Sequence, residues 1–198
     1  VATNTVRQLR APGNFLVPAE AALGHAIEVV SGREEARLVY LGVAHAQPPK
    51  DGQLRLVIDI GGGSTECIIG RGMEPLERES PQVGYIATTR RFFGNGKLSK
   101  KKWREAVIEA GAEVQQFANA YRALGWNEAI GASGTCKAIG PFSAAMKLPT
   151  GAVTAEALPQ VRDRLLQADS IAAIQLPGLS DERRPIIAGG VLVLEAAF

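Results

Sequence analysis

Two acidic residues enclose a short run of small residues near the middle of the chain. Asp59 and Glu66 stand on either side, and between them lie Ile60, Gly61, Gly62, Gly63, Ser64 and Thr65. Consecutive glycines allow backbone angles that residues with a Cβ avoid, so several N–H groups can converge on an anion, and the two hydroxyls are further donors. A carboxylate beside such a cradle is useful when a divalent cation lies between it and a phosphate. An ordinary tight hairpin with one buried carboxylate has the same spacing, and the residues alone leave both interpretations open.

The segments on both sides of these glycines predict two strands. Leu54 to Ile60 is an apolar run rich in β-branched residues and broken only by Arg55 and Asp59, which is typical of a buried strand. Residues 66–70 form a second short run of the same kind. We therefore expect a hairpin whose glycine-rich tip lies between the two carboxylates.

A second acidic pair begins a predicted helix that runs from Ser31 to about His45. Ser31 and Glu34 have the spacing of a capping box, in which the serine accepts from a free N–H and the glutamate reaches back to the cap, so Glu34 has a structural explanation. Glu35 has a weaker one, the general preference for acids in the first turn of a helix.

A cluster of cations surrounds one loop and the start of the clearest predicted helix, residues 99–124. Its members are Arg90, Arg91, Lys97, Lys100, Lys101, Lys102 and Arg104. Cations at a helix N-terminus oppose the helix dipole, so helix stability does not explain them. They could hold a long polyanion with salt-dependent affinity, or they could form a solvated basic face.

Further along, residues 127–132 predict a strand that ends in a turn of small residues, Gly131-Ala-Ser-Gly-Thr-Cys-Lys137, followed by a helix. This order leaves free N–H groups at the helix start, although a tight structural connection would look the same. The chain contains neither a P-loop nor a Gly-x-Gly-x-x-Gly turn. The remaining expected elements are helices at 15–23, 84–93 and 154–167, strands at 26–30 and within 75–83, and a last helix capped by Ser180.

Composition excludes several classes of protein. With 198 residues and 46% hydrophobic content the chain can bury a core, and its net charge of +2 gives no field that would demand nucleic acid or an anionic membrane. No apolar run approaches the roughly 18 residues of a membrane span, and the first residues are not a signal peptide. Cys67 and Cys136 are isolated, which favours reduced thiols and a cytoplasmic protein without specific nucleic-acid or membrane partners.

The central motif and four other stretches resemble the exopolyphosphatase / guanosine pentaphosphate phosphohydrolase family, in the family's order and over almost the whole chain. The motif, residues 59–66, looks like that family's second phosphate loop. The other stretches are residues 1–7, 27–37, 131–137 and 176–183. The family belongs to the actin, Hsp70 and sugar-kinase superfamily.

The resemblance implies an α/β fold: a mixed-sheet, ribonuclease-H-like (actin-like ATPase) lobe at residues 47–198, with a remnant of a first lobe and a linking helix at residues 1–46. The Gln47–Gly52 loop would mark the boundary. The family's earlier Asp-x-Gly-Ser-Asn loop is not found here, and the last residues stop within an apolar helical pattern, so we expect an internal piece of a longer protein.

The same resemblance implies a hydrolase of phosphoanhydrides that removes terminal phosphate from inorganic polyphosphate or guanosine pentaphosphate. Glu35 matches the proposed catalytic base, and Asp59 with Glu66 would help to place Mg²⁺ or another divalent cation. The phosphate-binding residues would be Gly61, Gly62, Gly63, Ser64, Thr65, Arg7, Gly134 and Thr135. The family also makes a homodimer a reasonable expectation. Two alternatives stay open: a kinase or ATPase of the same superfamily, against which the Glu35 segment argues, and a non-enzymatic binder of polyphosphate or a guanosine nucleotide.

Overall fold

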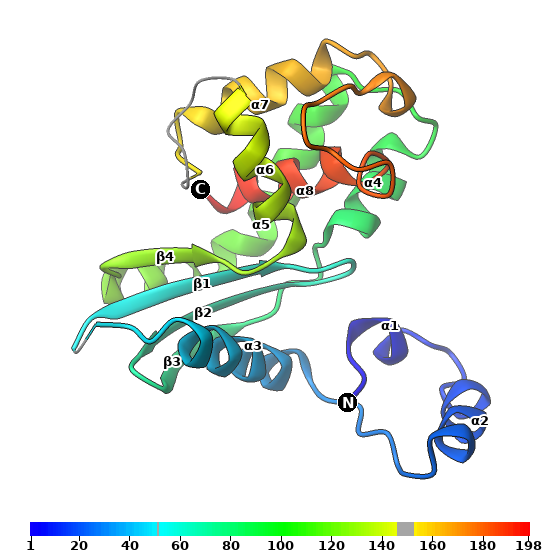
Figure 1. The fold of residues 1–198 in the computed structure, drawn as a ribbon, viewed down its shortest axis with the longest axis vertical. Helices are drawn as coiled ribbons and strands as arrows, with labels where there is room; N and C mark the ends of the chain where they lie inside the picture. The colour runs from blue at the N-terminus through cyan, green and yellow to red at the C-terminus, as the bar shows by residue number, and fades with distance from the viewer. Residues whose placement is uncertain (51, 146–152) are drawn as a thin grey trace.

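The sheet that carries the central motif has four strands in the order β3-β2-β1-β4. The computed structural model (Figure 1) describes residues 1–50, 52–145 and 153–198. β1 (Leu54–Ile60) pairs antiparallel with β2 (Thr65–Arg71), and β4 (Glu128–Gly131) runs parallel to β1. β3 (Glu74–Glu79) lies at the edge, beside β2. The expected hairpin, its glycine-rich tip and the edge strand are confirmed, and so is the mixed-sheet α/β fold class.

Helix α3 (Gly32–Ala46) covers one face of this sheet. Its apolar side packs Ala36, Tyr40 and Ala44 against Val57 and Ile68 of the hairpin. The side chain of Ser31 accepts from the N–H of Glu34, at 3.2 Å, as the sequence predicts.

The second half of the predicted capping box is wrong. The Glu34 carboxylate receives two hydrogen bonds from Arg37, at 2.7 and 2.8 Å, instead of reaching back to the cap. The guanidinium of Arg37, one turn along the helix, is a charged, bidentate donor to this carboxylate, and such a donor binds it more strongly than a single backbone N–H.

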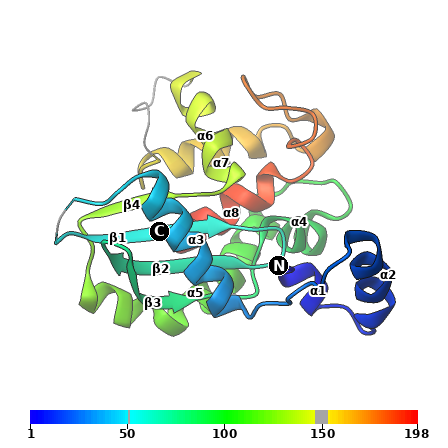
Figure 2. The same ribbon diagram turned by 60° about the horizontal axis from the view of Figure 1, so that its bottom comes forward.

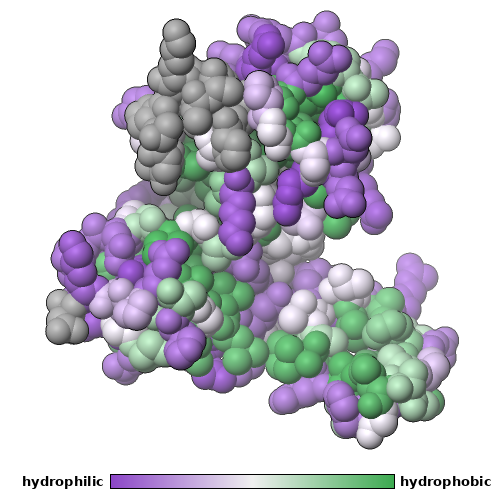
Figure 3. All heavy atoms as spheres, viewed as in Figure 1, coloured by the Kyte–Doolittle hydropathy of each residue, from purple (hydrophilic) through white to green (hydrophobic). Residues whose placement is uncertain are grey.

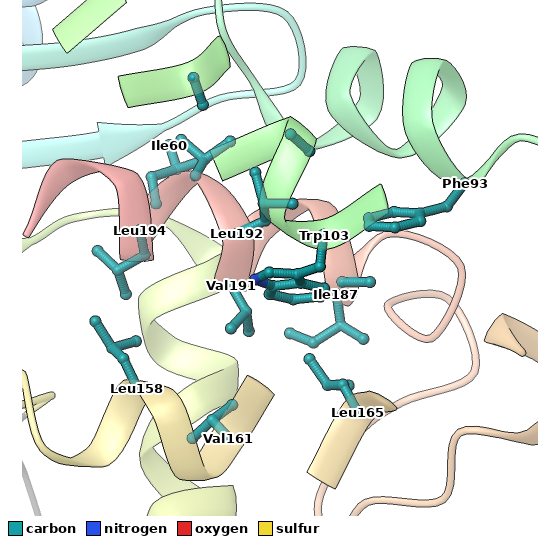
Figure 4. Close-up of a cluster of buried hydrophobic side chains, with 14 of the residues drawn as sticks. Ile60, Phe93, Trp103, Leu158, Val161, Leu165, Ile187, Val191, Leu192 and Leu194 are labelled. Atoms are coloured by element: carbon teal, nitrogen blue, oxygen red, sulfur yellow. The ribbon is translucent and has the colours of Figure 1, made fainter. Parts of the chain in front are cut away.

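The opposite face of the sheet is covered by a larger helical layer (Figure 1). This layer contains α4 (Tyr85–Phe93), α5 (Lys100–Leu124), α6 (Gly134–Ala145), α7 (Ala157–Leu166) and α8 (Ile187–Ala197), with a 3₁₀ turn at Ile171–Ala173. Its main core is drawn in Figure 4 and includes Ile60, Phe93, Trp103, Leu158, Val161, Leu165, Ile187, Val191, Leu192 and Leu194. The apolar helix α8 therefore lies buried in the middle of the layer, where it ties α4, α5 and α7 to the sheet.

The first thirty residues form a smaller part beside the hairpin tip, seen at the lower right in Figure 1 and again at the right in Figure 2. It contains α1 (Asn4–Arg7) and α2 (Gly13–Leu23). No residue of α2 is buried. Figure 3 shows apolar residues on its surface, where Phe15, Val17 and Leu23 are exposed. The predicted strand at residues 26–30 is wrong: in the described parts of the chain this segment makes a single bridge, between Ala2 and Val29, and no strand continues the pairing.

The helices expected at 15–23, 31–45, 84–93, 99–124 and 154–167 are confirmed with small shifts of their ends. The predicted cap at Ser180 is wrong, since residues 181–186 form turns and α8 starts only at Ile187. The boundary at residue 46 stays a prediction, and Asp51 of the predicted linker lies outside the described residues. Among the described residues, none of the helices combines the length and apolarity needed to span a bilayer.

Candidate active site

Asp59 and Glu66 lie side by side on the face of the sheet that carries α3. They are direct cross-strand partners in the β1–β2 register. Side chains alternate between faces along a strand, and Val57 and Ile68 pack under α3 whereas Ile60 packs in the opposite core. Residues 59 and 66 share the faces of Val57 and Ile68, so both carboxylates lie at the end of the sheet toward the start of α3.

The two oxygens of Glu66 have different surroundings. This residue is only 2% exposed, and its Oε1 accepts a hydrogen bond from Ser80 Oγ at 2.9 Å. Oε2 lies on the side of the glycine loop, 3.8 Å from the position of a Cβ built on Gly61. Burial raises the pKa of Glu66 from 4.5 to about 7, while hydrogen bonds from Ser64 and Ser80 lower it and the charges of Glu35 and Asp59 raise it.

The pKa of Asp59 is also raised, mainly by burial and further by the negative charge of Glu35. Glu35 is thus within electrostatic reach of both strand carboxylates. The three acidic groups come from β1, β2 and the first turn of α3, and they meet at one end of the sheet. The sequence predicts each residue, and the fold brings them together.

Arg7 reaches this group from α1. Its Nη2 lies 3.0 Å from Glu35 Oε2, and its Nη1 donates to the carbonyl oxygen of Val30 at 2.7 Å. Both side chains of the pair are about one-fifth exposed. The structure therefore places Arg7 beside Glu35, the predicted catalytic residue, and the ion pair holds the Glu35 carboxylate. Contact of Arg7 with phosphate stays a prediction.

The turn at the hairpin tip leaves three backbone donors without an acceptor among the described residues, the N–H groups of Gly62, Gly63 and Ser64. Gly61 N instead donates to Ser64 O, which closes the turn. Thr65 differs from the expectation, because its N–H donates to Pro81 O and its hydroxyl to Val83 O. Both donors of Thr65 are used inside the protein, so this residue supports the loop and offers no donor to an anion.

Two neighbours fix the position of the loop. The first turn of α4 donates from Tyr85 N to Gly61 O and from Ile86 N to Gly62 O, each at 2.9 Å. This contact requires a glycine before the helix, since a Cβ on Gly84 would lie 2.6 Å from backbone atoms of Gly61 and Gly62.

On the other side, the amide of Asn4 lies so close to Gly63 that a Cβ there would collide with Asn4 Oδ1. The loop is therefore enclosed between α4 and α1.

The turn between β4 and α6 lies next to Asp59. Ile58 pairs with Gly131 in the parallel register. The pKa of Cys136 is raised mainly by burial, and the charge of Asp59 raises it further. Thr135 is 4% exposed and packs against Gly190 of α8, and Arg183 lies against Gly134. The predicted strand–turn–helix is confirmed. Contact of Gly134 and Thr135 with phosphate stays a prediction, with the side chain of Thr135 turned into the core.

The cationic cluster lies apart from these carboxylates, at the far end of α4 and the start of α5. Arg91 forms a 2.8 Å ion pair with Glu109, and Lys102 donates to Asn95 Oδ1 at 3.2 Å. Within the described parts of the chain, five members have no acidic partner and are exposed: Arg90, Lys97, Lys100, Lys101 and Arg104. α4 is nine residues long, so about 13 Å of helix separates the cluster from the glycine loop.

Local sequence patterns did not predict the polar residues that surround the site, chiefly Asn4, Ser80 and Gln82. Asn4 Nδ2 donates to Gln82 Oε1 at 2.8 Å across 78 residues of chain. None of the three belongs to a motif whose spacing carries chemistry. The nearest local signal is Gly84, the first residue of the helix predicted at 84–93, and it points to none of these three side chains.

The donor set suits a divalent cation. Mg²⁺ is usually held through one or two carboxylates together with waters and substrate phosphates. The half-buried Asp59 and the buried Glu66 are two such carboxylates, both with raised pKa values, beside an anion cradle. In the described ranges there is no group of three or more His, Cys, Asp or Glu side chains arranged to hold a metal without other ligands. These residues therefore fit a cation shared with a bound phosphate.

Comparisons with known proteins agree with this geometry. The chain is 36% identical over 198 residues to a putative exopolyphosphatase of Haemophilus influenzae. It is 39% identical over the same length to a guanosine-5'-triphosphate,3'-diphosphate pyrophosphatase of Pseudoalteromonas translucida. The whole chain is matched in both cases, but it spans only 61% and 39% of these relatives.

Solved structures show the same fold. An exopolyphosphatase from Cytophaga hutchinsonii superimposes with a TM-score of 0.80 at 21% identity, over 98% of this chain and 64% of that one. An exopolyphosphatase-like protein superimposes with a TM-score of 0.79 at 26% identity, over 99% of this chain and 66% of that one. Both support the expected actin-like ATPase type of fold. The model of the Ppx/GppA phosphatase family matches residues 1–198, and the chain belongs to that family.

Proposed function

We propose that the protein of which this chain is part hydrolyses phosphoanhydrides, releasing terminal phosphate from inorganic polyphosphate or guanosine pentaphosphate. The observation that carries the proposal is the glycine loop, set between Asp59 and Glu66, with three N–H donors that have no acceptor among the described residues. The charge of Glu35 acts on both carboxylates. Family membership and the names of the two relatives support the same reaction.

The residues divide the work as phosphoryl transfer requires. The N–H groups of the loop bind the oxygens of the terminal phosphate, and Asp59 and Glu66 would hold a divalent cation that neutralises charge on the transferring group. Glu35 orients or deprotonates the attacking water, and Arg7 keeps that carboxylate in place from the opposite side. Most of the rate then comes from positioning and charge neutralisation.

An assay of the complete protein tests the proposal. Phosphate release is measured on long polyphosphate and on guanosine pentaphosphate, each with and without Mg²⁺. We expect cation-dependent release from at least one substrate. Binding without release would favour the non-enzymatic alternative, and release that appears only with a phosphate acceptor or with ATP would favour the kinase or ATPase.

We also propose that the exposed part of the cationic cluster contacts polyphosphate beyond the reacting phosphate. Lys97, Lys100 and Lys101 lack acidic partners in the part of the chain that the structure describes, and they lie about one length of α4 from the glycine loop. A short substrate bound at the loop cannot span that distance, whereas a long chain can.

Neutralising these three lysines as glutamines is expected to weaken long polyphosphate more than a short substrate such as tripolyphosphate. Because each phosphate contact releases counterions, the loss should shrink as the salt concentration rises. The measurement is KM for both substrates at several salt concentrations. A triple change of Arg10, Lys50 and Arg122 to glutamine removes the same charge from exposed positions elsewhere and serves as the control. Equal losses for long and short substrates would assign the cluster to an ordinary surface.

Glu66 should make the stability of the fold depend on pH. Its carboxyl binds a proton more tightly in the folded than in the unfolded chain, so the folded state holds more protons between about pH 4.5 and 7. The free energy of unfolding therefore falls as the pH rises through this window, by roughly 3 kcal/mol for a shift of this size. Glutamine has no such ionisation. In denaturant unfolding, the stability of Glu66→Gln relative to the wild type should therefore rise by up to that amount between pH 4.5 and 8. A stability difference that does not change with pH would contradict the assignment.

A cytoplasmic location and a homodimer also stay proposals. The two cysteines are both free thiols, which fits a reducing compartment.

A further inference from the structure

The last residue of β3 and the three residues that follow it contact three segments of the site. In this segment, residues 79–82, Glu79 lies 2.6 Å from Arg33 of α3, and Pro81 O accepts from Thr65 N at 3.1 Å. Gln82 Oε1 accepts from Asn4 and Gln8 of the first part, at 2.8 and 3.1 Å. The segment thus joins the start of α3, the hairpin and α1.

Ser80 is the member of this segment that touches a carboxylate. Its hydroxyl donates to Glu66 Oε1 at 2.9 Å, which leaves Oε2 on the side of the glycine loop. The backbone of α3 comes very close on its other side, since a Cβ on Gly32 would lie 2.6 Å from Ser80 Oγ. The same serine therefore contacts both Glu66 and the first residue of the helix that carries Glu35, three positions away.

We propose that Ser80 is a positioning residue, which fixes the orientation of the Glu66 carboxylate toward the glycine loop and its placement relative to the first turn of α3. The proposal rests on the proposed function, because it assigns Glu66 a task in holding the cation. Without the hydroxyl, Oε1 loses the donor Ser80 and only the hydrogen bond from Ser64 remains. The carboxylate is then less restricted in rotating about its terminal torsion, which has no strong preference of its own. Partners that orient metal ligands in this way typically contribute 10–100-fold to metal affinity or activity.

The test compares variants of the complete protein. Ser80→Ala removes the donor, and Ser80→Cys keeps the space beside Gly32 filled while offering only a weak donor. Arg33→Gln is the matched control, because it breaks the Glu79 contact and loosens the same segment on α3 without touching Glu66. Binding of Mn²⁺ is measured in the presence of inorganic phosphate, and crystal structures record the orientation of the Glu66 carboxylate.

We expect both Ser80 variants to bind Mn²⁺ about 10–100-fold more weakly and to show a turned or split Glu66 carboxylate, with Arg33→Gln near the wild type. Unchanged binding and orientation in both Ser80 variants, or an equal loss in Arg33→Gln, would overturn the proposal. Failure of the proposed function looks different: wild-type protein that hydrolyses neither substrate refutes the reaction, while the carboxylate orientation in the crystals still decides the role of Ser80.

Discussion

Glu35→Gln in the complete protein is expected to lower turnover by about 10²–10⁴-fold with little change in apparent substrate affinity. Glutamine has the same shape and keeps an oxygen that can accept from Arg7, so the fold and the approach of α1 should survive. What it loses is the group that accepts or orients the proton of the attacking water. Steady-state kinetics on polyphosphate and guanosine pentaphosphate, with thermal melts of both proteins, measure the effect.

The adjacent glutamate is the matched control. Glu34 pairs with Arg37 within α3, and both side chains of this pair are more than one-third exposed. Glu34→Gln should cost little stability, because an ion pair this exposed to solvent is weak, and should leave turnover unchanged.

A Glu35→Gln enzyme within about threefold of the wild type would be too active to have lost a general base. In that case Asp59, whose carboxylate lies at the same end of the sheet and whose pKa is raised by burial and by the charge of Glu35, would be the next residue to test. Asp59→Asn would then lose turnover at saturating Mg²⁺.

The second large effect is expected from Gly84→Ala. A methyl group at this position would lie 2.6 Å from Gly61 O and Gly62 O, and these are backbone atoms that cannot rotate away. Either the glycine loop or the start of α4 must move, and the two hydrogen bonds between them must lengthen. Since a displacement of about 1 Å at a reacting centre can cost about 10²-fold, we expect at least that loss in kcat/KM.

Gly111→Ala provides the control for this change. Gly111 lies inside α5 with no atom within 4 Å of an added Cβ, so alanine should leave activity intact and stabilise the helix by up to about 1 kcal/mol. Equal activities of the two variants would show that α4 does not hold the loop in its working position.

Local sequence was sufficient for the elements that carry the chemistry. The short apolar runs on both sides of three glycines predict the hairpin, and its register then makes Asp59 and Glu66 neighbours on one face. Ser31 predicts the start of α3, because a capping hydroxyl and the N–H that it accepts are only three residues apart. Each of these inferences depends on interactions between residues close together in the chain.

The tertiary structure decided which of those groups are available and what surrounds them. Thr65 looked like a donor, but contact with residues 81 and 83 uses both its N–H and its hydroxyl. Glu34 looked like half of a capping box, but Arg37 offers a stronger partner. The strand predicted at 26–30 has only one bridge, because strand formation requires a neighbour that the local sequence does not specify.

The residues around the site were invisible in the sequence for the same reason. Ser80 and Gln82 belong to no motif, and their importance comes from contacts made across 14 to 78 residues of chain. Hydrogen bonds over such separations depend on how the sheet, α3 and α1 pack together, and a local pattern carries no information about that packing. The sequence by itself determined the glycine loop, the carboxylates on either side of it and the helix capped by Ser31; the packing of α3 and α1 against the hairpin decided that Glu35, Arg7 and Ser80 meet there.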